Sequence, residues 1–282
     1  MKVKHIILRA KSFIKRNDIN LSDVDNTIEP SCVHLHWWHT GGAVQNVGDF
    51  LSVVVNDYMM KTNGLENVLL DFAAPGKKTK HLYAIGSIID GGYQDATIWG
   101  TGLLSGDRKL WWKRIRKLDI RCVRGPETRR VLIQNGYSCP ACYGDPALLM
   151  PLIYPANTEE KLYDYRVVQH YKYNCTHPSF LNPLTNDWKE FINEIVRSKL
   201  IISSSLHGII LAEAYGIPAI LLAHDMNMFK YRDYYYATGR MDFPVAKSVD
   251  EALQMSPPPL PDIKHLQVGL LNSYPKDLWG KS

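Results

Sequence analysis

The stretch that decides the fold of this chain is Leu200-Ile-Ile-Ser-Ser-Ser-Leu-His-Gly-Ile-Ile-Leu-Ala-Glu-Ala-Tyr-Gly-Ile-Pro-Ala-Ile-Leu-Leu-Ala223. Its first apolar run, 200–202, predicts a strand buried on both faces, and the run at 219–222 predicts a second strand. Between them we expect a short helix over 209–215, which Gly216 ends and Pro218 prevents from continuing. The stretch therefore forms one strand-loop-helix-strand unit.

The loop of this unit, Ser203 to Gly208, lies at the carboxyl end of a strand and the amino end of a helix. Open parallel sheets bind their ligands at that edge. Free backbone N–H groups and the positive end of the helix dipole favour an anion there. The imidazole of His207 adds a group that exchanges protons near neutral pH. The loop is therefore predicted to bind an anionic ligand.

The rest of the chain repeats the alternation of strands and helices, which predicts an α/β fold with parallel sheets. A proline-containing, aperiodic stretch at 151–163 predicts a linker between two Rossmann-like lobes, residues 1–152 and 153–282. A final helix is expected within 260–279. The other predicted strands are 33–38, 82–87, 96–102, 120–123 and 165–171, and the other predicted helices are 50–60, 126–135 and 188–199.

Composition excludes several classes of protein. The chain has 282 residues, 45% of them hydrophobic and 22% charged, which are the proportions of a globular protein with a full core. A net charge of +5 favours an anionic substrate or membrane surface, and no recognition motif for nucleic acid accompanies it. Five cysteines without a signal peptide indicate reduced thiols in a cytoplasmic protein. No apolar run approaches the ~20 residues of a membrane-spanning helix.

Two basic stretches suit an anionic membrane surface. Residues 1–17 combine lysines and arginines with apolar residues and contain no acid, which fits an interfacial amphipathic helix and equally a surface helix or a basic chain end. Residues 107–130 are also basic and include Trp111 and Trp112, which suit a lipid interface. A solvated helix face with two core tryptophans is the alternative that the pattern favours.

Neither histidine nor cysteine spacing predicts a metal or redox centre. His34, His36 and His39 are close in sequence, but no cysteine or carboxylate completes a site, and strand alternation explains the first two. Cys139-Pro-Ala-Cys142 has redox spacing but precedes a turn instead of opening a helix after a strand. We expect no metal and no redox role.

Five motifs resemble, in order and spacing, those of the polysaccharide pyruvyl transferase family, with the closer likeness to exopolysaccharide ketal pyruvyl transferases of the xanthan and succinoglycan type. They are Asn46-Val-Gly-Asp49, Val123-Arg-Gly-Pro-Glu-Thr-Arg129, Tyr143-Gly-Asp-Pro-Ala147, Ser203-Ser-Ser-Leu-His-Gly208 and Lys230-Tyr-Arg-Asp-Tyr-Tyr235 with Gly239-Arg240. The resemblance implies a GT-B-like pair of lobes with the active site in the cleft between them. It also implies transfer of pyruvate from phosphoenolpyruvate, as co-substrate, onto sugar hydroxyls without a further cofactor.

The resemblance assigns roles to residues. His207 and Asp49 are expected to be catalytic, and Asn46, Asp145 and Glu213 to hold the acceptor or assist. The donor is expected to contact Arg124, Ser203, Ser204, Ser205, Leu206, Lys230, Arg232 and Arg240. Many relatives carry a basic residue where this chain has Ser205, so the donor's charge must be met elsewhere. A helix-capping Asp49, a buried His207, a packed or surface His170 and a tyrosine-rich core segment are the structural alternatives.

The predicted function is ketal formation on a hexose of a lipid-linked exopolysaccharide repeat unit, by a cytoplasmic protein peripheral to the inner face of the membrane. Its partners would be phosphoenolpyruvate, the lipid-linked acceptor and an anionic membrane surface, and not nucleic acid. A sugar-nucleotide glycosyltransferase of the GT-B fold and a non-catalytic glycan-binding protein at the membrane surface are the two alternatives.

Overall fold

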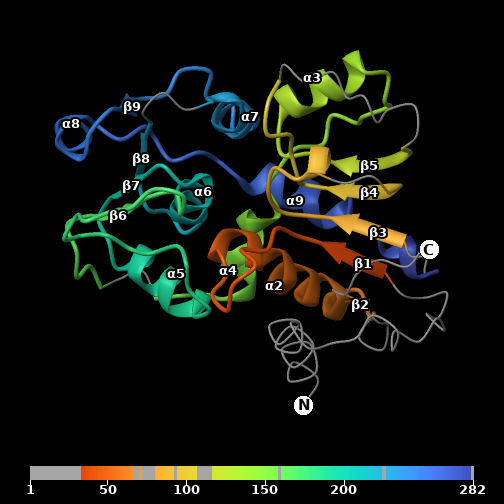
Figure 1. The fold of residues 1–282 in the computed structure, drawn as a ribbon, viewed down its shortest axis with the longest axis horizontal. Helices are drawn as coiled ribbons and strands as arrows, with labels where there is room; N and C mark the ends of the chain where they lie inside the picture. Colours follow the sequence, from red (N-terminus) through yellow and green to blue (C-terminus); the bar gives the residue numbers. More distant parts are fainter. Residues whose placement is uncertain are drawn as a thin grey trace.

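The computed structural model describes residues 33–65, 70–71, 80–91, 94–106, 116–157, 160–223 and 227–280. Its main features are two sheets, each made of parallel strands and covered by helices (Figure 1). The basic segment at 1–17 and the Trp111–Trp112 pair lie outside the described residues, so the membrane contacts predicted from them stay predictions.

The first sheet has five parallel strands in the order β2-β1-β3-β4-β5. Strands β1 and β3 contain histidines among their apolar residues, yet most residues of β1, β3 and β4 are buried, as expected for a sheet covered on both faces. The bounds are β1 Val33–His36, β2 Leu70–Asp71, β3 Lys80–Tyr83, β4 Ala96–Trp99 and β5 Leu118–Cys122. In Figure 1 the arrows of β1, β3, β4 and β5 point toward the second sheet, so their carboxyl ends face it.

The second sheet has four parallel strands in the order β6-β7-β8-β9. Its central pair, β7 and β8, comes from the two apolar runs that flank the serine-histidine loop, and every residue of both strands is buried. The bounds are β6 Arg166–Val168, β7 Ile201–Ser203, β8 Ala219–Leu222 and β9 Val245–Ala246. The predicted α/β class with parallel sheets is confirmed.

Helices pack between and around the sheets, and one core cluster includes residues of both sheets together with α2 and α6. The helices are α2 Val47–Thr62, α3 Pro126–Gln134, α4 Met150–Ile153, α5 Trp188–Val196, α6 Leu206–Ala214, α7 Phe229–Ala237, α8 Val249–Gln254 and α9 Lys264–Asn272, with 3-10 turns η2 Ile89–Gly91, η4 Pro146–Leu149 and η5 Lys276–Trp279. The last helix returns to the first sheet, as Trp99 Nε1 donates to the Leu270 carbonyl over 3.0 Å.

Two helices begin three residues earlier than predicted, and this changes the site. Helix α2 starts at Val47 because the Asn46 side chain caps it, accepting from the Gly48 amide over 3.0 Å. Helix α6 starts at Leu206, so His207 lies in the first helical turn and not in the loop before it. The final helix is also shorter than the predicted range, because α9 ends before Pro275.

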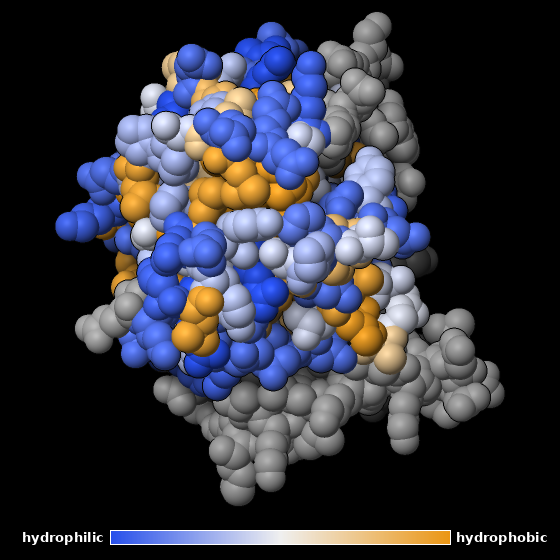
Figure 2. Space-filling model, turned by 90° about the vertical axis from the view of Figure 1, so that its left-hand side faces the viewer, coloured by the Kyte–Doolittle hydropathy of each residue, from blue (hydrophilic) through white to orange (hydrophobic). Residues whose placement is uncertain are grey.

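The side of the molecule formed by the second sheet is mostly hydrophilic, with a group of apolar side chains near its middle (Figure 2). Among the described residues, none of the helices has both the length and the apolar character needed to span a bilayer.

Candidate active site

A cavity of about 220 Å³ lies where loops after the strands of both sheets meet. Its position at the carboxyl ends of parallel strands is where α/β sheets bind ligands. The first sheet and its helix α2 contribute Trp38, Asn46, Asp49, Gly86, Ser87, Ile88, Leu104 and Arg124, and the second contributes His170, Tyr171, Lys172, Ser205, Leu206, His207 and Lys230.

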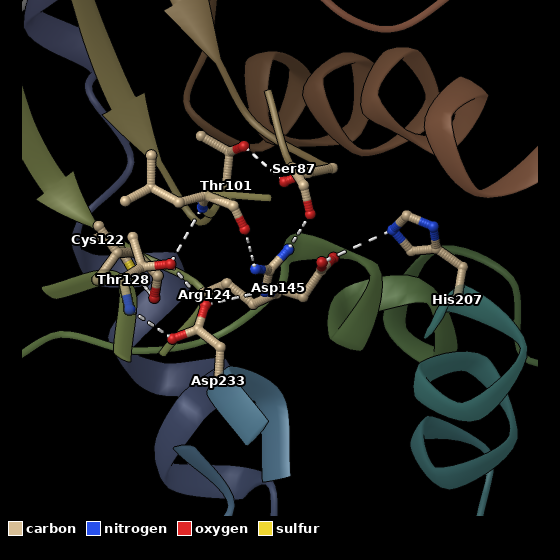
Figure 3. Close-up of polar contacts among 11 residues, drawn as sticks. Ser87, Thr101, Cys122, Arg124, Thr128, Asp145, His207 and Asp233 are labelled. Atoms are coloured by element: carbon tan, nitrogen blue, oxygen red, sulfur yellow. Dashed lines mark hydrogen bonds and ion pairs between the residues drawn. The ribbon is translucent and has the colours of Figure 1, made fainter. Parts of the chain in front are cut away.

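His207 faces a buried carboxylate (Figure 3). Its Nε2 lies 3.7 Å from Asp145 Oδ2, with 12% of the His207 side chain and 0% of the Asp145 side chain exposed. Asp145 uses its other oxygen to cap η4, accepting from the Ala147 amide over 3.0 Å. Within the described residues neither Nε2 nor Oδ2 has a hydrogen-bond partner. His207, which lines the cavity, thus has a buried ring nitrogen that faces the equally buried and unsatisfied Oδ2 of Asp145 behind it.

The position of the imidazole depends on the absence of a side chain at residue 48. A Cβ built on Gly48 would lie 2.2 Å from His207 Nδ1, a distance that non-bonded atoms do not tolerate. The glycine lets the N-terminal turns of α2 and α6 approach each other closely. This is a physical reason for glycine in the Asn46-to-Asp49 motif.

Asp49 lies in the first turn of α2 and lines the cavity. Burial raises its pKa to about 6, and the neighbouring Asp145 acts in the same direction, while His207 and Lys230 lower it. Asn46 caps the helix, so the alternative of Asp49 as a plain cap is wrong. A carboxyl with this pKa beside a histidine provides two proton-exchanging groups in one cavity.

Lys230 provides the cation deepest in the second-sheet wall. Burial lowers its pKa to about 8, and Arg124 and Lys172 lower it further while Asp49 raises it. Lys230 therefore still carries its charge at pH 7. Burial together with Lys230 lowers the pKa of His170 to about 4, so His170 is neutral at the same pH. His170 lines the cavity, as expected of a histidine that faces the cleft and not of a merely packed or surface one.

Arg124 lines the cavity but is held almost entirely by the protein (Figure 3). Its guanidinium donates to Asp233 Oδ2 over 3.0 Å, to Ser87 Oγ over 2.6 Å and to the Leu103 carbonyl over 2.8 Å. Thr128 donates two further hydrogen bonds to the Asp233 carboxylate. Burial raises the pKa of Asp233, and Arg124 and Thr128 oppose the rise. Arg124 is thus a fixed and partly neutralised cation.

Six predicted residues do not line the cavity: Asp145, Ser203, Ser204, Glu213, Arg232 and Arg240. Arg240 forms a two-pronged ion pair with Glu213, with Nη1–Oε1 at 2.6 Å and Nη2–Oε2 at 2.7 Å. Tyr234 donates a hydrogen bond to the same carboxylate, so the charge of Arg240 is used within the protein. Arg232 is exposed on α7 and is absent from the cavity lining. The cavity therefore gives no support to the predicted donor contacts of both arginines or to the supporting role of Glu213, which stay predictions.

Of the three predicted serines, Ser205 lines the cavity, and Ser203 and Ser204 do not. The Ser203 hydroxyl lies 2.9 Å from the Val168 carbonyl and accepts from the Ser205 amide over 3.0 Å, so it ties the loop together. Ser204 accepts from the His170 amide over 2.9 Å and lines a different cavity, of about 410 Å³. Ser205 is the N-cap residue of α6 and, with Leu206, lines the site.

Sequence reasoning missed several lining residues, among them Trp38, Ser87, Leu104, Tyr171 and Lys172. Each lies at the end of a predicted strand or just beyond it, so the rule that ligands bind at carboxyl edges identifies these segments although it cannot identify the side chains. It also missed Asp233, which lies within the tyrosine-rich motif and is buried instead of exposed.

Among the described residues, no group of three or more histidines, cysteines and acids is arranged to hold a metal ion. Burial lowers the pKa of His34 to about 3 and that of His36 to about 4, so both are neutral.

Comparison with known proteins places the chain in a family. The sequence model of the family described as polysaccharide pyruvyl transferase matches residues 46–226, which is more than half of the chain and includes His207, Asp145, Asp49 and Arg124. The chain belongs to the polysaccharide pyruvyl transferase family. The predicted family resemblance is thereby confirmed.

Two relatives share about half of the chain. The succinoglycan biosynthesis protein ExoV of Rhizobium meliloti is 28% identical over 153 residues, which cover 50% of this chain and 45% of ExoV. The uncharacterized protein L143 of Acanthamoeba polyphaga mimivirus is 28% identical over 160 residues, covering 51% of this chain and 54% of that protein. The matched part spans about half the length of these curated relatives. No solved structure gives a significant match.

Proposed function

We propose that this pyruvyl transferase family member uses the cavity to transfer pyruvate from phosphoenolpyruvate onto two hydroxyls of one hexose, with release of phosphate. The observation that carries the proposal is His207, which lines the same cavity as Asp49 and Lys230 and has the buried carboxylate of Asp145 behind it. A cation, two proton-exchanging groups and a helix N-terminus in one small cavity match a small, highly charged enol ester.

Two cations, Arg124 and Lys230, would offset the negative charge of the donor. Arg124 is held rigidly by Asp233, and Lys230 carries charge whose burial is unfavourable without an anion. An incoming phosphate or carboxylate would relieve that cost at Lys230. The first turn of α6 adds backbone N–H groups that have no partner within the helix.

The first chemical step adds one acceptor hydroxyl to the enol ester. C3 of the donor takes a proton, for which we propose His207 as the source, and C2 becomes electrophilic. The oxygen of the first hydroxyl bonds to C2 and gives its proton to Asp49, whose pKa of about 6 suits a base at neutral pH. Asp145 would stabilise the imidazolium form of His207 and hold the ring in place.

The second step closes the ketal. The C2–O bond to phosphate breaks, and the second hydroxyl of the same sugar bonds to C2. Of the two protons that the hydroxyls release, one balances the proton gained at C3 and the other leaves with the phosphate. The products are a cyclic pyruvate ketal and inorganic phosphate, without any change of oxidation state.

We propose an exopolysaccharide repeat unit, carried by a lipid at the inner membrane face, as the acceptor. The support is the name of the relative ExoV, a succinoglycan biosynthesis protein, and the excess of basic residues in the chain. We further propose that the two sheets are the cores of two lobes, residues 1–152 and 153–282, in a GT-B-like arrangement.

Incubation of the protein with phosphoenolpyruvate and a depyruvylated succinoglycan oligosaccharide tests the proposal. We expect one phosphate released for each ketal formed, and a rise in melting temperature with phosphoenolpyruvate alone. A melting temperature raised by sugar nucleotides, with no response to phosphoenolpyruvate, would instead support the glycosyltransferase alternative. Sugar binding without phosphate release would support the non-catalytic alternative.

A further inference from the structure

Trp37 and Trp38 are adjacent in sequence but differ in environment. Trp37 is 5% exposed and packs against Phe50, with ring centroids 5.7 Å apart, as a core residue does. Trp38 is 50% exposed and lines the mouth of the active-site cavity. Leaving half of an indole in water forgoes a large part of the free energy that its burial would contribute. The exposure of Trp38 therefore needs a reason that core packing does not supply.

The exposed indole lies beside a residue of the opposite wall. Its side chain is close enough to Tyr171 to oppose the rise that burial causes in the pKa of Tyr171. The ring of Tyr171 in turn stacks on His170, with centroids 4.7 Å apart. Leu104, which is 46% exposed, is a second apolar side chain in the cavity lining. The mouth thus presents an aromatic face with an apolar neighbour.

The cavity itself leaves little room for the acceptor. Its volume of about 220 Å³ lies below the usual range for ligand pockets, roughly 300–1,000 Å³. A three-carbon phosphate ester would occupy most of this space. A sugar must therefore bind at the mouth, with only its reacting edge inside.

Ketal formation also makes an unusual demand on the acceptor. Two hydroxyls of one ring must reach the same carbon atom, so neither can be used as a permanent hydrogen-bonding handle. The ring is better held by its face, where the C–H groups of a pyranose form an apolar surface that packs against an aromatic ring.

We infer that Trp38, beside Tyr171, is the platform on which the acceptor pyranose stacks while its two hydroxyls point into the cavity. The inference rests on the proposed function and specifies its acceptor: a pyranose with one accessible C–H face, bound mainly by that face. Trp38 is a binding residue for the acceptor and has no contact with the donor.

The test compares the kinetics of the Trp38→Ala and Trp38→Phe variants with those of the unaltered protein. With depyruvylated succinoglycan oligosaccharide as acceptor, we expect Trp38→Ala to raise the acceptor KM roughly tenfold or more and to leave the KM for phosphoenolpyruvate unchanged. Trp38→Phe retains an aromatic face and should show a smaller rise. Met241→Ala truncates another exposed apolar side chain, 68% exposed and outside the cavity lining, and serves as the control.

An unchanged acceptor KM in Trp38→Ala, or equal increases in both KM values, would overturn the inference while leaving pyruvyl transfer intact. If the unaltered protein releases no phosphate, the proposed function fails separately. In that case calorimetric titration of the same oligosaccharide into wild type and Trp38→Ala still decides the matter: a roughly tenfold weaker affinity in the variant supports the platform, and equal affinities contradict it.

Discussion

Helix α6 carries an ionisable residue near each end, and the two differ in how completely their contacts are satisfied. Near the C-terminus, Glu213 accepts two hydrogen bonds from Arg240 and one from Tyr234. Near the N-terminus, His207 Nε2 stops 3.7 Å short of Asp145 Oδ2. The complete pair leaves nothing for a ligand, whereas one member of the incomplete pair, His207, lines a cavity. Unsatisfied hydrogen-bonding capacity beside a cavity, and not charge itself, therefore distinguishes the site from the scaffold.

The largest effect is expected from His207→Ala. Loss of the imidazole should lower kcat for phosphate release at least about 1,000-fold, since a proton donor and its positioning are both removed. The melting temperature should change little, because the side chain is partly exposed and donates no hydrogen bond to the described residues. Turnover within tenfold of wild type would show that the incomplete pair is not catalytic.

Breaking the complete pair should act on stability instead. Arg240→Met leaves the Glu213 carboxylate, which is 1% exposed, without its charged partner. We expect the free energy of unfolding, measured in urea, to fall by about 3–5 kcal/mol. Arg240→Lys keeps the charge without the two-pronged geometry and should lose less. The kcat of the folded enzyme should stay near that of wild type in both. A large fall in kcat at unchanged stability would restore Arg240 as a donor-binding residue.

These two cases also show what sequence can and cannot predict. The apolar runs at 200–202 and 219–222 were enough to predict β7, β8 and the edge at which the site lies, because burial of a parallel strand leaves a local signature. The pairing of Glu213 with Arg240, 27 residues away, leaves none. Both residues lie in or beside family motifs, and only the three-dimensional structure shows that they bind each other.

Other differences between the predictions from sequence and the structure also have physical causes. Helix starts were predicted from apolar spacing, but the caps Asn46 and Ser205 set them three residues earlier. Trp38 and Tyr171 come from the ends of β1 and β6, strands of different sheets, so no local pattern places them together. The burial of Asp233 follows from its partner Arg124, which lies 109 residues away in the sequence.

Asp145→Asn tests the His207–Asp145 pair by replacing only the Asp145 oxygen that has no hydrogen-bond partner among the described residues. The asparagine oxygen can still accept from the Ala147 amide, so the cap of η4 is kept. Loss of the negative charge behind His207 should lower kcat about 100-fold, a smaller effect than loss of the imidazole. Asp57→Asn removes a carboxylate from the outer side of α2 and is the matched control. Equal kcat in Asp145→Asn and wild type would remove Asp145 from the mechanism.

The smallest effect on stability concerns pH. Asp49 has a folded-state pKa of about 6, raised from 3.8, so the folded protein binds its proton more tightly than the unfolded chain does. Stability attributable to Asp49 is therefore lost as pH rises from about 4 to about 6. Asp49→Asn should raise the melting temperature at pH 7 and not at pH 3.5.

The Asp49 carboxyl should also determine how kcat/KM depends on pH. If Asp49 is the base, kcat/KM falls about tenfold for each pH unit below 6, and Asp49→Asn abolishes this acid limb together with most of the activity. An acid limb that persists unchanged in Asp49→Asn would assign it to another group.

Mass spectrometry of the acceptor tests the central claim most directly. A depyruvylated succinoglycan oligosaccharide would be incubated with phosphoenolpyruvate and either the unaltered protein or His207→Ala. The account predicts that the sugar gains the mass of one pyruvate less one water with the unaltered protein, and nothing with the variant. An unmodified sugar with the unaltered protein, or equal modification by both, would contradict it.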